Sequence, residues 1–583
     1  MTKKEELIKR VLSGIAVLGI IGCCALLFPQ VRQIVISIGG RILGKNFNGD
    51  VWQLSSVALV WLGLCVVILA ISSSRFRIPP ISGMKKTIIL KIICVILICL
   101  YLFLLIFLAL SDTTVWIDEV WSLIQIQGSW KNTLYLTIQD YHPPLYFFIL
   151  KTCSLIFGNS IGTMRLVSVF PIILMIIVVS QFLRNEFSDK AALVFLLSCF
   201  AHKHMAYHST CIRMYGWAIF FVAMMFVSAW YFFKSGKVRW WGSLLFCAVG
   251  AAYTHNFAAI AAGIGYLLLL GYVVRYRRDK VVALLLLAFS GVVLYSPWIL
   301  PAWGQISRVS DGFWIPPLTI KRILGCVVSF FFTGDWFTVP LLFLVFCLAS
   351  VPFLVKKNKT EKELFICGGA CCVALTIVFS IVVSIVGRPV LVSRYLTPLF
   401  GLVWIFFAVV VSTTGMGRGI TTLIYAVLLM LGLQSSTLAV RDTKTQNRRF
   451  CIFRSYIMER IQPDDILFVP SVGGSVATDF EEKNCLHMTA ILKYLFPDYL
   501  VVREPNTTPA EDSGGSSDEV RLFDVIFGNS IVNYEPGLFS GRTVWTIVVE
   551  MDRSNTIVPE GENEFCGVFG WSVYRFKLFR SKS

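Results

Sequence analysis

Repeated apolar runs of about 20 residues, the length of helix that crosses the hydrocarbon core of a bilayer, dominate this chain. Of its 583 residues, 56% are hydrophobic, whereas soluble domains are usually about 45–50% apolar. The sequence therefore predicts a polytopic α-helical membrane protein with about thirteen spans. The runs lie near 11–28, 51–72, 86–110, 163–183, 189–208, 212–233, 239–255, 257–273, 281–300, 336–355, 363–387, 392–412 and 418–437.

The basic residues between these runs predict the orientation of the chain in the membrane. Segment 143–158 is apolar but short for a span, and it can lie along the membrane surface instead. If it lies there, the basic loops all fall on one side, which the positive-inside rule assigns to the cytoplasm. We therefore expect a cytoplasmic N-terminus, an extracytoplasmic C-terminal domain and a multi-pass protein of the cell membrane. The loops are Arg75/Arg77/Lys85/Lys86, Lys234/Lys237/Arg239, Arg275/Arg277/Arg278/Lys280 and Lys356/Lys357/Lys359/Lys362.

The net charge of +18 does not indicate a nucleic-acid partner, because no soluble segment shows a basic stripe with interleaved aromatic residues. The bilayer is the expected partner of the apolar runs.

The pattern divides the chain into three regions. Residues 1–85 form an extra N-terminal region with two spans, and residues 86–439 form a transmembrane module whose first outer loop is 111–162. Residues 440–583 are polar and form the C-terminal domain. Strand-like runs at 466–470 and 543–551 and a helical stretch at 487–496 predict a small α/β or α+β fold there. Segments 29–47 and 320–333 are expected to be interfacial helices.

The first outer loop carries an acidic pair directly after a span. Asp118 and Glu119 lie between Trp116 and Trp121. A carboxylate at this place can act as a general base towards an acceptor hydroxyl or amine. The alternative is that Asp118 caps a helix that begins at Val120, since Asp is a favoured N-cap residue.

A second polar signal follows in the same loop. Asp140 and His142 precede Pro143 and Pro144, which are expected to start a helix. Because a helix N-terminus attracts anions, this segment is a candidate binding element. The alternative is an interfacial turn without a ligand.

Arginines on the outer face form a third signal, because they run against the positive-inside trend. Arginine binds phosphate in bidentate fashion, so together they predict a phosphate-bearing ligand at the outer leaflet. For each one alone, the alternative is a side chain that snorkels to the interface. These residues are Arg165, Arg213, Arg308, Arg388 and Arg394.

His204 and His208 have the i, i+4 spacing that permits a shared metal. No carboxylate accompanies them in the sequence, so we expect hydrogen-bonding roles instead.

An ordered set of motifs gives these residues a common meaning. The acidic pair at 118–119 is followed by D-x-HPPLYF at 140–147, G-x-S…R at 158–165, IRMY at 212–215, Y-x-H at 253–255 and SRYLTP at 393–398. Over roughly 90–410 the chain resembles the GT-C superfamily of polyprenyl-phosphate-dependent glycosyltransferases. The similarity is greatest to the protein O-mannosyltransferase and aminoarabinose-transferase group and its bacterial relatives.

The resemblance implies a sugar donor linked to a polyprenyl phosphate and an outer-face acceptor, which is a lipid, a glycan or a protein. It implies inverting transfer with the first-loop aspartate, Asp118, as base; Glu119 and Asp140 are further catalytic candidates. It implies that Arg213 and Arg394 bind the donor phosphate, with Arg165 and His142 behind them. Tyr215 and His255 belong to the same motifs and are expected in the site.

The expected chemistry requires neither a nucleotide nor a metal, and no Walker-type glycine loop is present. A divalent metal is possible but is not expected. Two features depart from the resemblance: the spans at 11–28 and 51–72 precede the usual first span, and the C-terminal domain carries no matching motif.

A flippase for lipid-linked sugars, or another transporter, is the rival interpretation. Transporters usually carry ionisable groups near the bilayer midplane. Here the central thirds of the predicted spans are nearly free of charge and the acids collect at one surface, which favours an enzyme. A non-catalytic membrane scaffold would not account for that gathering of acids and arginines.

Overall fold

The computed structural model describes residues 86–310, 318–331, 355–387, 389–415, 418–469, 488–496, 498–503, 531–533, 542–549, 563–571 and 574–582, together with positions 350, 353 and 538. The predicted spans 11–28 and 51–72, nearly all of 336–355 and the surface segment 29–47 lie outside these residues. The number of about thirteen spans therefore stays a prediction.

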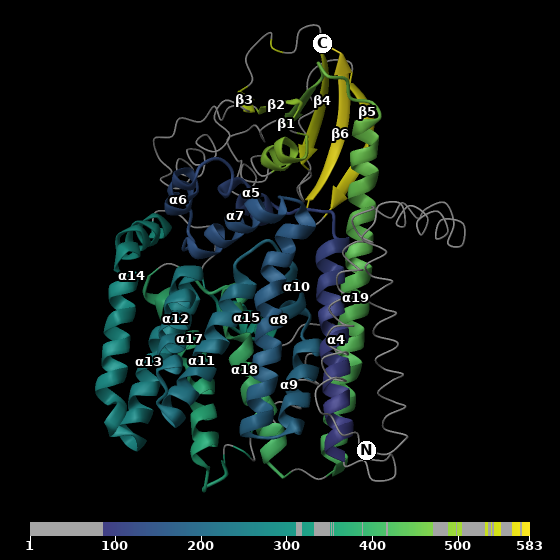
Figure 1. Cartoon of the computed structure of the whole chain (residues 1–583). Helices are drawn as coiled ribbons and strands as arrows, with labels where there is room; N and C mark the ends of the chain where they lie inside the picture. Colours follow the sequence, from purple (N-terminus) through teal and green to yellow (C-terminus); the bar gives the residue numbers. More distant parts are fainter. Residues whose placement is uncertain are drawn as a thin grey trace.

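A bundle of long helices forms the body of the described chain (Figure 1). Within the described residues, 7 helices are long and apolar enough to cross a membrane, which confirms a polytopic α-helical protein. Helix α12 (Val238–Thr254) packs against two of them, α11 and α13. The 7 spans are α4 (Lys86–Ser111), α8 (Ile161–Glu186), α11 (Tyr215–Ser235), α13 (Asn256–Tyr276), α14 (Val281–Ser310), α17 (Glu361–Val386) and the unit of η3 (Ser393–Leu399) with α18 (Phe400–Thr413).

Polar residues and glycines set the ends of these helices. The side chain of Ser160 accepts a hydrogen bond from the Thr163 amide at the start of α8, and Thr360 does the same for Glu363 at the start of α17. Helix α11 ends at Gly236, whose φ of +62° is a left-handed conformation that glycine adopts without a Cβ clash.

The predicted span at 189–208 is not one continuous helix. It consists of α9 (Asp189–Ala201) and α10 (Lys203–Thr210), which are separated at His202. The backbone of His202 is extended, and its Nε2 lies 3.1 Å from the carbonyl oxygen of Phe330 in helix α15 (Ile320–Phe331). The buried histidine thus finds a hydrogen-bond partner outside its own helix. Helix α15 confirms the predicted helix at 320–333 over residues 320–331; the last two residues lie outside the described part of the chain.

Three shorter helices lie between one end of the bundle and the C-terminal sheet: α5 (Ile117–Gln125), α6 (Trp130–Gln139) and α7 (Leu145–Phe157) (Figure 1). At 13 residues, α7 is too short to cross a bilayer. Its last residues, Leu155, Ile156 and Phe157, are 66–69% exposed. These apolar side chains at the end of a short helix support the interpretation that 143–158 lies along the membrane surface.

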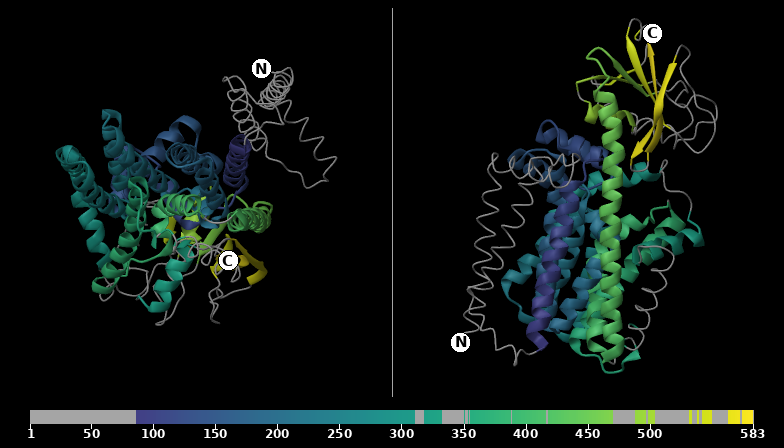
Figure 2. Two further views of the ribbon diagram at one scale, coloured as in Figure 1. Left: turned by 90° about the horizontal axis from the view of Figure 1, so that it is seen from below. Right: turned by 90° about the vertical axis from the view of Figure 1, so that its right-hand side faces the viewer.

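Helix α19 (Arg418–Met458) has 41 residues and runs from the bundle to the sheet (Figure 2). It is continuous through residue 440, where the sequence placed the start of the C-terminal domain.

The sheet has the strand order β3-β2-β1-β4-β6-β5. Strands β3, β2, β1 and β4 are parallel, and β6 and β5 pair antiparallel. Residues 488–495 are helical. The predicted strands at 466–470 and 543–551 are thus observed over 466–469 and 543–549, and the predicted helix near 487–496 over 488–495. The mixed helix and strand content of the domain agrees with the predicted α/β character. The strands are β1 (Ile466–Val469), β2 (Leu500–Arg503), β3 (Ile531–Asn533), β4 (Thr543–Val549), β5 (Asn563–Trp571) and β6 (Tyr574–Lys582).

The C-terminal domain rests directly on helix α5. Val120 and Ile124 of α5 belong to one buried apolar cluster with Phe453 and Ile457 of α19 and Trp545 of β4. Because burial of large apolar side chains is the main source of such association, the sheet and α5 are expected to move together.

Candidate active site

The candidate site lies where the bundle meets α5–α7, below the sheet. Nine of the residues that the sequence predicted for it come from elements that meet there: α5, the segment after α6, α8, the residues before and at the start of α11, the α12–α13 junction and η3. These residues are Asp118, Glu119, Asp140, His142, Arg165, Arg213, Tyr215, His255 and Arg394, and contacts of a few ångströms connect them. Arg388 and the side chain of Arg308 lie outside the described part of the chain.

Asp118 presents a carboxylate at the edge of the site. Its Oδ2 accepts a hydrogen bond from Nη1 of Arg394 at 3.2 Å, and the two side chains keep 21% and 25% of their surface exposed. Helix α5 begins at Ile117, with Trp116 as N-cap residue. The alternative in which Asp118 caps a helix that begins at Val120 is therefore wrong: Asp118 lies within the first turn, and its side chain faces an arginine.

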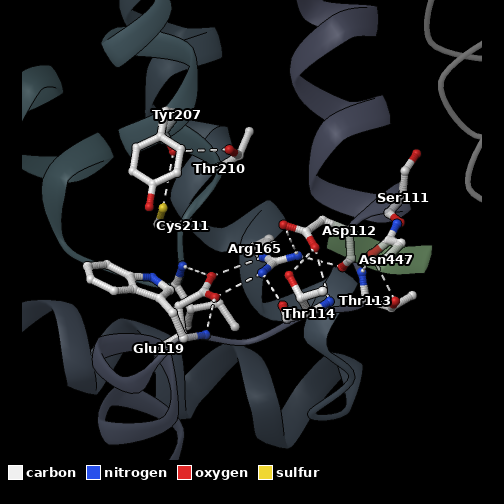
Figure 3. A network of polar contacts seen from close by, with 12 residues as sticks. Ser111, Asp112, Thr113, Thr114, Glu119, Arg165, Tyr207, Thr210, Cys211 and Asn447 are labelled. Atoms are coloured by element: carbon white, nitrogen blue, oxygen red, sulfur yellow. Dashed lines mark hydrogen bonds and ion pairs between the residues drawn. The ribbon is translucent and has the colours of Figure 1, made fainter. Parts of the chain in front are cut away.

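Glu119, by contrast, is 1% exposed, and both of its carboxylate oxygens are occupied. Oε1 accepts from Nε of Arg165 and from the Ile212 amide, both at 3.0 Å, and Oε2 accepts from Nη2 of Arg165 at 2.9 Å (Figure 3). Oε2 also lies 3.4 Å from the Trp116 amide at the start of α5. A carboxylate in this position connects three segments and has no open face towards a substrate.

Arg165 extends this network to the end of α4. Its side chain is 4% exposed, forms an ion pair with Asp112 at 3.2 Å and donates to the carbonyl oxygen of Thr114 at 2.6 Å (Figure 3). The guanidinium is therefore fully engaged by acidic and carbonyl oxygens. This geometry suits the fixing of residues 112–119 better than the binding of a donor phosphate.

Asn447 of α19 holds the same segment from the side of the C-terminal domain. Its Oδ1 accepts from the amide and the hydroxyl of Thr113 at 2.8 and 2.9 Å, and its Nδ2 donates to the carbonyl oxygen of Ser111 at 2.5 Å (Figure 3). The residues that lead into α5 are thus fixed by α8 on one side and by α19 on the other.

We expect Asn447→Ala to destabilise the protein by about 1–3 kcal/mol, because the amide of Thr113 and the carbonyl of Ser111 lose their partner. Thermal unfolding of the detergent-purified protein measures this as a lower transition temperature. Arg448→Ala, an exposed neighbour on α19, serves as the control and should leave the transition unchanged. Equal transition temperatures for the two variants would contradict the role of Asn447.

Asp140 and His142 form the second polar group of the site. The Asp140 Oδ2 atom lies 3.1 Å from His142 Nδ1 and accepts from Nε2 of Gln125 at 2.9 Å. Burial by itself would raise the pKa of Asp140, but His142 and Arg213 outweigh it and hold the pKa below its usual range. Burial lowers the pKa of His142, an effect that Asp140 offsets only in part.

The lowered pKa favours the neutral ring of His142, which donates to Asp140 in the tautomer that carries its proton on Nδ1. Its Nε2 can then accept from Nη2 of Arg213 at 3.3 Å. The relay Asp140–His142–Arg213 therefore orients the guanidinium of Arg213.

Arg213 is 4% exposed and is held close to Asp118. Its Nη1 donates to the carbonyl oxygen of Asp118 and to Oγ of Ser122, both at 3.1 Å. Within the described part of the chain, its buried Nε has no hydrogen-bond acceptor. Since an unmet buried donor is costly, this atom is a candidate partner for a bound anion.

Aromatic rings close the site on the bundle side. The ring of His255 lies 5.9 Å from Tyr215, 6.0 Å from Tyr395 and 6.3 Å from His142, centroid to centroid. His255 also begins α13, because its Nδ1 accepts from the Phe257 amide at 3.1 Å. Nε2 then carries the proton of the neutral ring.

Several polar residues of the site were not predicted. Ser122 and Gln125 stand four and seven residues after Asp118 on the same helix, so helical spacing alone placed them on its face. Gln305 of α14 and Asn256 of α13 donate to carbonyl oxygens of the segment that carries Asp140 and His142, at 3.0–3.3 Å. The sequence feature that could have indicated these two residues is a single amide side chain within an otherwise apolar run.

A metal centre has no support from the described residues, where no group of three or more His, Cys, Asp or Glu side chains is able to hold an ion. The rings of His204 and His208 are 5.7 Å apart, and His208 packs against Tyr215 at 5.0 Å. The expectation that the reaction requires no metal or cofactor stays a prediction.

Comparison with known proteins identifies the fold. Residues 141–300 match a family described as dolichyl-phosphate-mannose-protein mannosyltransferase. The structure is similar to that of ArnT from Cupriavidus metallidurans bound to undecaprenyl phosphate, over 83% of this chain and 97% of that one, with a TM-score of 0.51 and 13% identity. The apo state of ArnT gives a TM-score of 0.54 over 84% of this chain and 98% of ArnT, with 11% identity. No curated protein matches significantly in sequence.

Identities this low show the fold alone, and the family match covers the segment from Tyr141 to Leu300, which contains Arg165, Arg213 and His255. The two findings agree with the order of motifs in the sequence. The chain therefore has the GT-C fold of ArnT, and its resemblance to the GT-C superfamily is confirmed.

Proposed function

We propose that this protein transfers a sugar from a polyprenyl-phosphate-linked donor to an acceptor at the outer face of the membrane, with inversion at the anomeric carbon. The observation that carries the proposal is the pair of Asp118 and Arg394, 3.2 Å apart and both partly exposed where the spans end. The reaction requires a base that deprotonates the acceptor and a cation that stabilises the leaving phosphate, and these two side chains supply both. The ArnT-like fold and the mannosyltransferase match support the donor class.

Asp118 is the proposed general base. Its carboxylate takes the proton of an acceptor hydroxyl or amine while the acceptor atom forms a bond to the anomeric carbon. The bond from that carbon to the phosphate oxygen breaks, and its electron pair leaves with the lipid phosphate. Attack and departure occur on opposite faces of the sugar, which gives inversion.

Arg394 and Arg213 are the proposed phosphate ligands. The leaving phosphate gains negative charge in the transition state, and preorganised cations stabilise that charge without rearrangement. Arg394 is within reach because it is partly exposed. Arg213 offers its buried Nε while its other two nitrogens hold the Asp118 carbonyl, Ser122 and His142.

The remaining predicted residues receive positioning roles. Glu119 and Arg165 fix the path of residues 112–119 through their buried ion pair at 2.9 Å. Asp140 and His142 orient Arg213, and Tyr215 and His255 form an aromatic wall. These roles differ from the sequence-based expectation, in which Glu119 and Asp140 were candidate catalytic groups and Arg165 and His142 secondary phosphate ligands.

The acceptor approaches from the side of the C-terminal domain in this proposal, since the sheet rests on α5 next to Asp118. The proposed acceptor is a lipid, a glycan or a protein. An outer-face reaction also follows from the positive-inside rule applied to the basic loops.

The experiment that tests the proposal compares cells that lack the protein with cells that produce it. Mass spectrometry of surface glycans, glycolipids and glycoproteins should reveal a sugar whose attachment depends on the protein. In a parallel arm, purified protein in vesicles is supplied with a polyprenyl-phosphate sugar extract. A covalent product is expected; movement of the lipid-linked sugar across the bilayer without a product would favour the flippase instead.

A further inference from the structure

A second site lies at the other end of the spans from Asp118. It is a cavity of about 580 Å³ between α8, α11 and α12. On α8, its residues Gln181 and Asn185 follow Arg165 by 16 and 20 positions. At 1.5 Å per residue, the cavity is roughly 25–30 Å from the candidate active site, close to the full thickness of a bilayer core.

The cavity is divided into an apolar wall and a polar mouth. Val178 and Phe182 of α8 and Val227 of α11 form the wall, and Tyr231 stacks on Trp240 with ring centroids 4.5 Å apart and planes at 19°. Aromatic pairs of this kind are favoured where hydrocarbon meets the polar headgroups.

The mouth carries positive charge. Lys234, Lys237 and Arg239 line it, and no acidic residue does so among the residues that line the cavity. Lys234 is already paired with Glu186 at 2.8 Å. The structure gives Lys237 and Arg239 no acidic partner in the described part of the chain, and the guanidinium of Arg239 lies 5.1 Å above the ring of Trp240.

Neutral donors complete the mouth. The amides of Gln181 and Asn185 are exposed, and Gln181 connects Arg184 to Asn185 through hydrogen bonds at 2.5 and 2.8 Å. A further guanidinium is thereby held one turn from the cavity. The arrangement offers several hydrogen-bond donors and an excess of cations to a single negatively charged group.

We infer that this cavity binds an anionic phospholipid, with its phosphate between Lys237 and Arg239 and an acyl chain along the wall of Val178, Phe182 and Val227. The combination of a cationic mouth and an apolar wall fits a charged amphiphile better than free phosphate, which would leave the wall in contact with water. Anionic lipids are enriched in the cytoplasmic leaflet, where the positive-inside rule places this end of the spans.

Lipid retention measured by native mass spectrometry tests the inference. The full-length protein is reconstituted in nanodiscs that contain phosphatidylcholine and phosphatidylglycerol, released into detergent and scored for bound lipid. We expect preferential retention of phosphatidylglycerol, and a loss of about thirtyfold in retention for Lys237→Gln/Arg239→Gln, since two charged contacts of roughly 1 kcal/mol each are removed.

The matched control is Arg275→Gln/Arg278→Gln, which removes the same charge from a neighbouring basic loop that does not belong to this cavity. It should retain phosphatidylglycerol like the wild type. Both double variants change exposed side chains, and size-exclusion profiles report on their folding. Equal retention of the two lipids, equal loss in both double variants, or displacement of the lipid by millimolar inorganic phosphate would overturn the inference.

Discussion

Replacement of Asp118 by Asn is expected to lower sugar transfer about 10²- to 10⁴-fold, the usual contribution of a general base. Asparagine keeps the size of the side chain and an oxygen that can still accept from Arg394, now 3.2 Å away. What it loses is the ability to take a proton from the acceptor. The measurement is the rate of product formation in vesicles at saturating polyprenyl-phosphate sugar, together with binding of undecaprenyl phosphate.

Binding of the lipid phosphate should persist in this variant, because Arg213 and Arg394 are untouched. Asp464→Asn, an exposed aspartate before β1, is the matched control and should transfer sugar at the wild-type rate. Transfer by Asp118→Asn within threefold of the wild type would remove Asp118 from the role of base.

Replacement of Glu119 by Ala is expected to destabilise the protein by about 3–5 kcal/mol. The buried guanidinium of Arg165 would lose its buried ion-pair partner and keep only Asp112, whose side chain is 28% exposed. Residues 112–119 would also lose the contacts of Glu119 with Arg165 and with the Ile212 amide. Sugar transfer should therefore fall even in the fraction of the protein that is folded. Thermal unfolding in detergent and the yield of monodisperse protein measure the effect.

Two further variants make this prediction specific. Glu119→Leu/Arg165→Met leaves neither charge buried and should be more stable than Glu119→Ala. Asp442→Asn removes an exposed ion pair with Lys203 at 3.2 Å and should lower the free energy of unfolding by no more than about 1 kcal/mol. A larger loss for Asp442→Asn than for Glu119→Ala would contradict the structural role of Glu119.

The nine residues that were named from the ordered motifs lie close together in the candidate active site. Asp118 and Arg394 are 276 positions apart and still form an ion pair. Both are charged residues next to predicted spans, and this pattern in the sequence indicated that they belong to one site. Within the described residues, most of the predicted helices are observed, because a period of 3.6 and a length of about 20 residues leave few other structures in a bilayer.

The division of labour within the site was not predictable in the same way. Glu119 and Asp118 are adjacent acids, and only tertiary structure shows that Glu119 is 1% exposed whereas the Asp118 side chain is 21% exposed. Gln305 and Asn447 form hydrogen bonds with backbone carbonyl and amide groups. Because nearly every residue has these groups, no pattern of side chains in the sequence predicts such a contact. At the break between α9 and α10, His202 contacts a carbonyl oxygen of α15, which is distant in sequence.

Helix α19 also limits how the extramembrane sheet can move. Its 41 residues form one continuous helix of about 60 Å, which packs against α9 of the bundle at one end and against β5 of the sheet at the other. A displacement of the sheet relative to the bundle therefore requires α19 to tilt or to bend. An acceptor that displaces the sheet is therefore expected to displace the segment Ser111–Thr113 as well, because Asn447 of α19 is hydrogen-bonded to it.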